Sequence, residues 1–109
     1  MPGLSTDLAD GSPPVLHVRG DVDMANAEQL SAALEHAFSV DPTVIVDMAE
    51  VTFIDGAGLR VILNAAESRD GVGPLTLVNA SRVESLLQRV GLDEMPSINF
   101  ASNGSGNVR

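Results

Sequence analysis

The chain has 109 residues, of which 44% are apolar and only 3% aromatic, so one packed domain with an aliphatic core is expected. It contains no Cys and no Lys, which excludes disulfides, thiolate sites, P-loop nucleotide hydrolysis and Schiff-base chemistry. The net charge of −9 comes entirely from residues 1–55, and without a basic stripe no nucleic-acid partner is expected.

No apolar run is long enough to cross a membrane, and the first residues do not resemble a signal peptide. We therefore expect a cytoplasmic protein without direct membrane insertion. The acidic residues either serve solubility alone or favour a basic protein partner.

Residues 1–14 are predicted to form a leader that contains at most a weak edge strand. The partly alternating segment 15–19 predicts a strand that ends in a turn at Gly20 and Asp21. Asn26 and Gln29 have the spacing of a capping box, and the apolar stripe after them predicts a helix that ends at Asp41.

Segment 43–46 is β-branched and predicts a buried strand that ends at Asp47, while segment 51–54 is expected to continue extended to Asp55. Two glycines follow Asp55, and the apolar spacing then predicts a helix over about 57–69. The sequence thus places a strand-to-helix junction at FIDGAGL, residues 53–59.

A further strand is predicted at 75–78, followed by an S-x-x-E capping box at Ser81. The helix that opens there is expected to end at Gly91 and to turn Val83, Leu86, Leu87 and Val90 inward. Segment 98–100 predicts a last short strand, and 101–109 a disordered tail.

The order of elements predicts an α/β fold with a single mixed sheet of four to five strands. The first two strands are expected to pair antiparallel and the others parallel. Residues 15–100 are expected to make up the domain.

Groups that could support catalysis are few. His17 lies in a predicted strand and His36 on a polar helix face, and neither has metal-ligand spacing. Asp21, Asp47 and Asp55 follow predicted strands, so they could converge at the carboxyl edge of the sheet and hold a divalent cation, although turn and cap roles are favoured. We expect no enzyme, no metal site and no cofactor.

Residues 46–59, VDMAEVTFIDGAGL, resemble the signature of STAS domains, the family of bacterial anti-sigma factor antagonists. The GDVD segment at 20–23 is similar to the family's G-E/D-x-D segment, and LTLV at 75–78 with Ser81, Leu86-Leu87 and Gly91 agrees with its last third. The resemblance covers about residues 15–100 and implies helices mainly on one side of the sheet.

The resemblance implies an antagonist that docks an anti-sigma factor. In partner-switching members the residue after the Asp is typically Ser or Thr, and phosphorylation there adds about two negative charges that repel the partner. Here Gly56 and Ala57 take this place, so we expect the phosphorylation switch to be lost. Thr52 and Ser81 are the nearest hydroxyls and are poor substitutes, because Ser81 is expected to be occupied as a cap.

By the same resemblance, the partner surface comprises the turn after the second strand, the strand-to-helix junction and the start of the last helix. The expected partner-binding residues are Asp21, Asp23, Met24, Asp55, Gly56, Ala57, Gly58, Leu59, Arg60 and Ser81. The expected partner is a kinase-like anti-sigma factor, and a weak homodimer is compatible with it.

Two alternatives remain open. The chain is a STAS subunit of a lipid-transport or other membrane-associated complex, or it is a nucleotide- or small-molecule-binding sensor. The sensor lacks support from the sequence, which has no lysine or glycine-rich loop to hold a phosphate.

Overall fold

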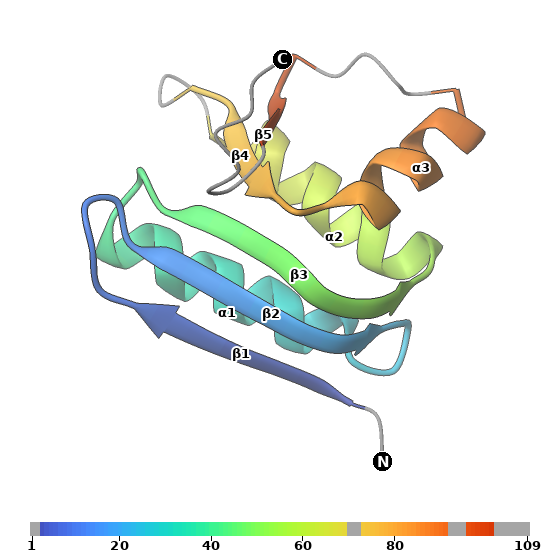
Figure 1. Cartoon of the computed structure of the whole chain (residues 1–109), viewed down its shortest axis with the longest axis horizontal. Helices are drawn as coiled ribbons and strands as arrows, with labels where there is room; N and C mark the ends of the chain where they lie inside the picture. The colour runs from blue at the N-terminus through green and yellow to red at the C-terminus, as the bar shows by residue number, and fades with distance from the viewer. Residues whose placement is uncertain (1–2, 70–72, 92–95, 102–109) are drawn as a thin grey trace.

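A computed structural model describes residues 3–69, 73–91 and 96–101. These residues form an α/β fold with a five-stranded mixed sheet and three helices, as predicted (Figure 1). The strands are β1 (Leu4–Ala9), β2 (Val15–Val22), β3 (Ile45–Ile54), β4 (Leu75–Val78) and β5 (Ile98–Ala101). The helices are α1 (Ala27–Val40), α2 (Gly56–Glu67) and α3 (Ser81–Arg89).

The strands lie in the sheet in the order in which they follow in the chain, β1-β2-β3-β4-β5. β1 pairs antiparallel with β2, and each later pair is parallel, which confirms the predicted pairing. Helical crossovers between parallel strands bring the carboxyl ends of β2, β3 and β4 to the same edge of the sheet. The loops that follow these ends are the ones that can build a common surface.

The core lies between one face of the sheet and the helices, and α1 is seen behind β2 and β3 in Figure 1. Alternation along β2 explains this placement, because Leu16 and Val18 are buried whereas His17 and Arg19 point to the other face and stay partly exposed. The core side chains are almost all aliphatic, as the composition predicts.

β3 extends well beyond β4. Only Ile45, Val46 and Asp47 of β3 have partners in β4, so the second half of β3 has no neighbouring strand on that side among the described residues. α3 lies there instead, and Nε of Arg82 donates a hydrogen bond to the backbone oxygen of Val51 at 3.0 Å. The end of β3 is therefore bordered by a strand on one side and a helix on the other.

Two predicted strand ends are wrong. β2 does not turn at Gly20 but continues to Val22, because Gly20 adopts a φ of 95° at an irregularity in the register with β3. β3 does not end at Asp47 but runs on to Ile54, because hydrogen bonds satisfy the carboxylate of Asp47 within the strand.

Both predicted capping boxes are also wrong. Asn26 occupies the N-cap position of α1, but its Oδ1 accepts from the backbone N–H of Asp23 and its Nδ2 donates to the carbonyl of Asp21, so it closes the β2–α1 turn instead. Ser81 is the first residue of α3 and makes no capping hydrogen bond, since Ala80 holds the N-cap position.

The end of α3 differs from the prediction, whereas the leader contains the predicted edge strand. Val90 was expected to face inward, but α3 ends at Arg89 and Val90 is 54% exposed. The predicted tail at 101–109 lies outside the described residues except for Ala101, which ends β5. Within the predicted leader, Leu4–Ala9 forms a six-residue edge strand.

Candidate functional site

The β3–α2 junction is organised by Asp55. Its Oδ1 accepts hydrogen bonds from the backbone N–H groups of Ala57 at 2.9 Å and Gly58 at 3.1 Å, which makes it the N-cap of α2. A carboxylate at this position also interacts favourably with the positive end of the helix dipole. The sequence-based expectation that this junction turns directly from strand to helix is confirmed.

The two glycines of the junction have different roles. Gly56 is exposed as the first residue of α2, and a Cβ added there would have no atom within 4 Å. Gly58 is buried, and a Cβ there would lie 2.5 Å from Cγ1 of Val22 and 2.9 Å from Cγ1 of Ile54. Gly58 is needed for close packing of α2 on the sheet, whereas nothing in the packing requires glycine at position 56.

The β2–α1 turn lies directly beside this junction. The N–H of Asp55 donates to the carbonyl of Val22 at 3.1 Å, and the hydroxyl of Thr52 donates to Oδ1 of Asp21 at 2.6 Å. Met24 protrudes from the turn with 80% of its surface exposed. An apolar side chain so exposed beside an open helix terminus is typical of a binding surface.

The structure brings the expected partner-binding residues to one edge, but they do not all reach its surface. Gly58 and Leu59 are buried against the sheet, while Gly56 and Arg60 are exposed. We call the accessible set the docking edge. It consists of Asp21, Asp23, Met24, Asp55, Gly56, Ala57, Arg60 and Ser81.

A groove of about 430 Å³ connects Ser81 to the junction. It runs between the end of β3 and α3, in the space that β4 leaves open because it stops short of this region. We call it the arginine groove. Its lining residues are Phe53, Ile54, Ser81, Arg82, Ser85, Leu86 and Arg89.

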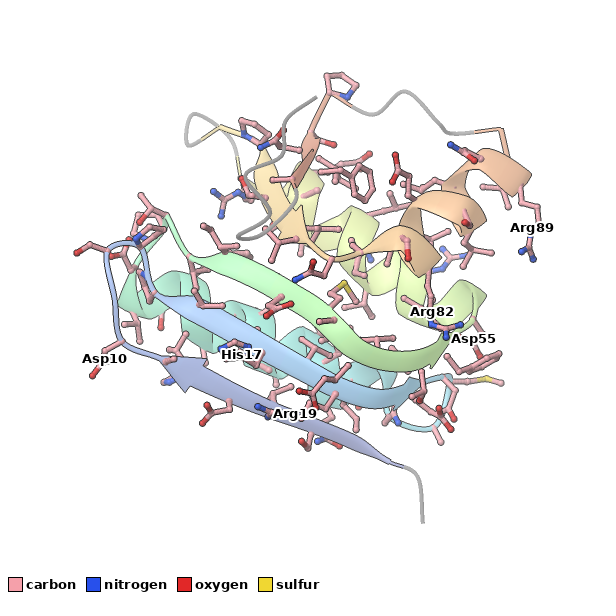
Figure 2. All side chains as sticks on the ribbon, in the orientation of Figure 1. Asp10, His17, Arg19, Asp55, Arg82 and Arg89 are labelled. Carbon is pink, nitrogen blue, oxygen red and sulfur yellow. The ribbon has the colours of Figure 1, made fainter. Side chains whose placement is uncertain are left out.

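The sequence reasoning did not identify this groove. Arg82, Ser85 and Arg89 are spaced by three and four residues in α3, which places them on one helix face. That spacing was available as a signal, but the groove also needs the length difference between β3 and β4. Figure 2 shows Arg82 and Arg89 on the same side of the molecule as Asp55.

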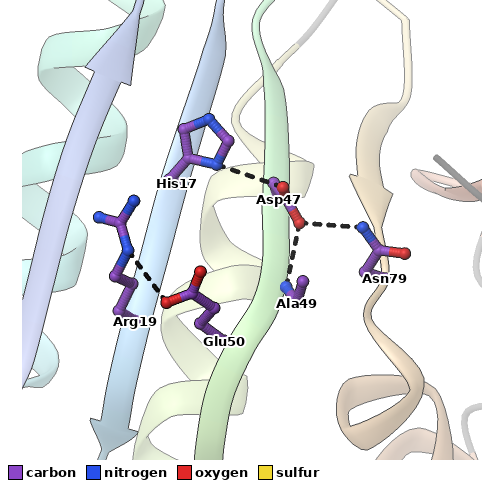
Figure 3. A network of polar contacts seen from close by, with 6 residues as sticks. All are labelled: His17, Arg19, Asp47, Ala49, Glu50 and Asn79. Carbon is purple, nitrogen blue, oxygen red and sulfur yellow. Dashed lines mark hydrogen bonds and ion pairs between the residues drawn. The ribbon is translucent and has the colours of Figure 1, made fainter. Parts of the chain in front are cut away.

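A polar network on the sheet face away from the core was also missed (Figure 3). Asp47 is only 9% exposed; its Oδ2 lies 3.2 Å from Nδ1 of His17, and its Oδ1 accepts from Ala49 N at 3.0 Å and Asn79 Nδ2 at 3.1 Å. Asn79 has a positive φ of 56°, a conformation that Asn tolerates better than most residues. Pairing of His17 with Asp47 in the register of β2 and β3 creates this contact.

The acidic residues do not converge as the divalent-cation hypothesis requires. Asp21 accepts from Thr52, Asp47 lies within β3 and Asp55 caps α2, so the expectation that they follow three strand ends at one edge is wrong for Asp47. Within residues 3–69, 73–91 and 96–101, no group of three His, Cys, Asp or Glu side chains lies close enough to share a metal ion. At this edge, Asp21 and Asp55 therefore serve as hydrogen-bond acceptors and contribute negative charge.

Among the described residues, none of the helices combines the length and the apolar character that a membrane span requires.

Comparison with known proteins adds a family and a set of structural relatives. A family model described as "Mlab, STAS domain" matches residues 5–98. A crystal structure of an anti-sigma factor antagonist from Mycobacterium paratuberculosis superposes with a TM-score of 0.73 at 22% identity, covering 89% of this chain and 86% of that one. No curated protein matches the sequence.

The antagonist SpoIIAA is similar in both of its forms. Its unphosphorylated form has a TM-score of 0.65 at 22% identity, with 93% of this chain and 90% of that chain covered. The phosphorylated Bacillus SpoIIAA has a TM-score of 0.62 at 22% identity, with 93% of each chain covered. At this identity the likeness is one of fold.

Proposed function

Since this chain belongs to the STAS domain family, we propose that it is an anti-sigma factor antagonist that binds an anti-sigma factor through the docking edge. The observation that carries the proposal is the open N-terminus of α2, where Gly56 is exposed beside the 80% exposed Met24. The structural likeness to anti-sigma factor antagonists supports it. The role is binding in the cytoplasm and not catalysis.

In this proposal, some residues of the junction maintain its structure and others contact the partner. Asp55 fixes the helix start through its two hydrogen bonds, and the buried Gly58 and Leu59 hold α2 against the sheet. Gly56, Ala57 and Arg60 then provide the surface that a partner contacts. A rigid scaffold that presents a few exposed groups is the usual basis of specific recognition.

We further propose that this antagonist has lost the phosphorylation switch. Gly56 and Ala57 carry no hydroxyl, and the hydroxyl of Thr52 is engaged with Asp21. The surface at position 56 is uncharged and small, like that of a dephosphorylated antagonist. Regulation then comes from the amount of the protein or from another signal.

The test of the function is recovery of a partner with the purified full chain. A tagged chain incubated with lysate of its own source should retain a kinase-like anti-sigma factor, identified by mass spectrometry and then bound again as a purified protein. Recovery of transporter subunits in its place would refute the proposal and support the alternative.

The test of the lost switch uses intact mass. Incubation of the full chain with the recovered anti-sigma kinase and ATP should leave the mass unchanged, whereas Gly56→Ser should gain one phosphate. A phosphate on the wild-type chain, for example on Ser81, whose hydroxyl does not cap α3, would contradict loss of the switch.

One observation favours a second function. The matching family model is described by the name Mlab and not as an anti-sigma factor antagonist. The second candidate is the alternative that the sequence left open, a STAS subunit of a lipid-transport or other membrane-associated complex. The same docking edge would then contact another subunit of that complex, and the recovery experiment separates the two candidates.

A further inference from the structure

The arginine groove has a composition unlike the rest of this acidic chain. Phe53 borders it with half of its surface exposed, and Leu86 and Ile54 add apolar surface. Arg82 and Arg89 supply positive charge, and no lining residue is acidic. In a protein with net charge −9, this combination marks a local site with the opposite sign.

Among the described residues, the two arginines have hydrogen-bond donors that no other group accepts. Arg82 uses Nε for the carbonyl of Val51, and within the described residues its Nη1 and Nη2 groups have no hydrogen-bond partner. Arg89 makes no hydrogen bond or ion pair in the same part of the chain. The bond to β3 fixes the position of Arg82, so its guanidinium is preorganised to receive an acceptor from outside.

We propose that the arginine groove receives an acidic segment of the partner, in which a carboxylate lies beside an apolar side chain. The carboxylate pairs with Arg82 and Arg89, and the apolar side chain packs on Phe53 and Leu86. This inference rests on the proposed function, since the partner is the anti-sigma factor. It specifies the residue types with which that partner contacts the groove. Charge complementarity and the exposed aromatic ring are what select this occupant.

The groove also fixes the orientation of the partner. Asp21 and Asp23 lie on the β2 side of the end of β3, and Arg82 lies on its α3 side. The surface is therefore acidic on one side of β3 and basic on the other. A partner docks in one direction only, with basic groups over the β2–α1 turn and the acidic segment in the groove.

Variants of the full chain test the proposal with the purified anti-sigma factor. Arg89→Gln and Phe53→Ser should each weaken binding about tenfold or more, because each removes one half of the contact. Arg19→Gln is the matched control for charge, since Arg19 pairs with Glu50 and does not line the groove, so the variant should keep the affinity within about twofold. Thermal unfolding of each variant shows whether the fold is kept.

A second arm uses a defined probe. The acetylated and amidated peptide Ala-Leu-Glu-Leu-Ala, added to the isotope-labelled full chain, should shift the NMR signals of Phe53, Arg82 and Arg89. The same peptide with Gln in place of Glu should shift them less. Raising the salt concentration should weaken the binding of the Glu peptide and leave the binding of the Gln peptide unchanged.

The two arms separate this inference from the proposed function. If the chain binds the anti-sigma factor but Arg89→Gln and Phe53→Ser bind as Arg19→Gln does, the groove is not the contact and the proposed function stands. If the Glu peptide occupies the groove but no anti-sigma factor binds, the groove chemistry stands and the proposed function fails. If neither peptide shifts the NMR signals of the groove residues, or both shift them equally, the groove does not select an acidic segment and the inference is refuted.

Discussion

Gly58 of α2 packs directly on Val22 of β2, so closely that a Cβ on Gly58 would lie 2.5 Å from Cγ1 of Val22. Val22 is fully buried and its branched side chain has little freedom to move. This contact determines how near the start of α2 lies to the sheet, and thereby where the exposed Gly56 is held.

The contact predicts opposite effects for the same substitution at the two glycines. Gly58→Ala should destabilise the fold by about 1–3 kcal/mol, because the added methyl group overpacks a rigid part of the core. Gly56→Ala is the matched control and should be neutral or stabilise by up to about 1 kcal/mol, since it meets open space in a helix. Urea unfolding of both variants measures the change in the free energy of unfolding. Equal stabilities of the two variants would show that Gly58 does not pack closely on Val22.

Asp55 is predicted to stabilise the fold as a cap and not through its charge alone. Asp55→Ala should cost about 1 kcal/mol, because the N–H groups of Ala57 and Gly58 lose their acceptor. Asp55→Asn retains an oxygen acceptor and should lose much less. If both variants were destabilised alike in chemical unfolding, the charge would be the dominant contribution.

Two carboxylates of β3 provide a comparison between a buried and an exposed polar contact. Asp47→Ala should destabilise by about 1–2 kcal/mol, because it removes the buried carboxylate that accepts the part-buried hydrogen bonds from Asn79 and the Ala49 N–H. Glu50→Ala removes an exposed pair with Arg19 and should cost less than about 1 kcal/mol. The reverse order in thermal or urea unfolding would exclude a structural role for the Asp47 network.

The pKa of Asp41 predicts one pH dependence. The hydroxyl of Thr43 and then its backbone N–H donate to Oδ1 of Asp41 at 2.7 and 2.8 Å, and both lower the pKa of this carboxyl. A lowered folded-state pKa contributes stability above the ordinary pKa, and this contribution is lost as the pH falls through the lowered value.

Thr43→Val should therefore raise the pKa of Asp41 in an NMR titration and reduce stability at neutral pH. The difference in stability between the variant and the wild type should vanish once Asp41 is protonated in both. A pKa unchanged by the substitution would show that the hydroxyl does not hold the carboxylate.

The sequence predicted the sheet and its pairing well, because alternation and β-branched runs record which face each strand buries. It predicted the cap at Asp55 for the same local reason, since the acceptor and the N–H groups lie within three residues. The errors at Asn26 and Ser81 have a common cause. A capping-box pattern shows that a side chain can reach the helix end, but tertiary contacts decide where it bonds, and Asn26 bonds to Asp23 and Asp21 instead.

Features that depend on how the strands pair could not be predicted from the sequence. The sequence places Asp47 at the end of a strand, and only its contacts with His17 and Asn79 explain how a carboxylate lies inside β3. The arginine groove depends on β4 being shorter than β3, which no local pattern reports. The expected partner residues were brought to one edge, but only the structure shows that Gly58 and Leu59 are buried below it.

Calorimetry with the purified anti-sigma factor and three forms of the full chain tests most directly whether the N-terminus of α2 docks an anti-sigma factor. Gly56→Glu adds a charge that suits a helix N-terminus, so the fold should be kept, while a docked partner would have to bury the larger charged side chain. We predict that Gly56→Ala binds as the wild type does and that Gly56→Glu binds at least about tenfold more weakly. Equal affinity of Gly56→Glu and the wild type would contradict the claim that this junction is the interface.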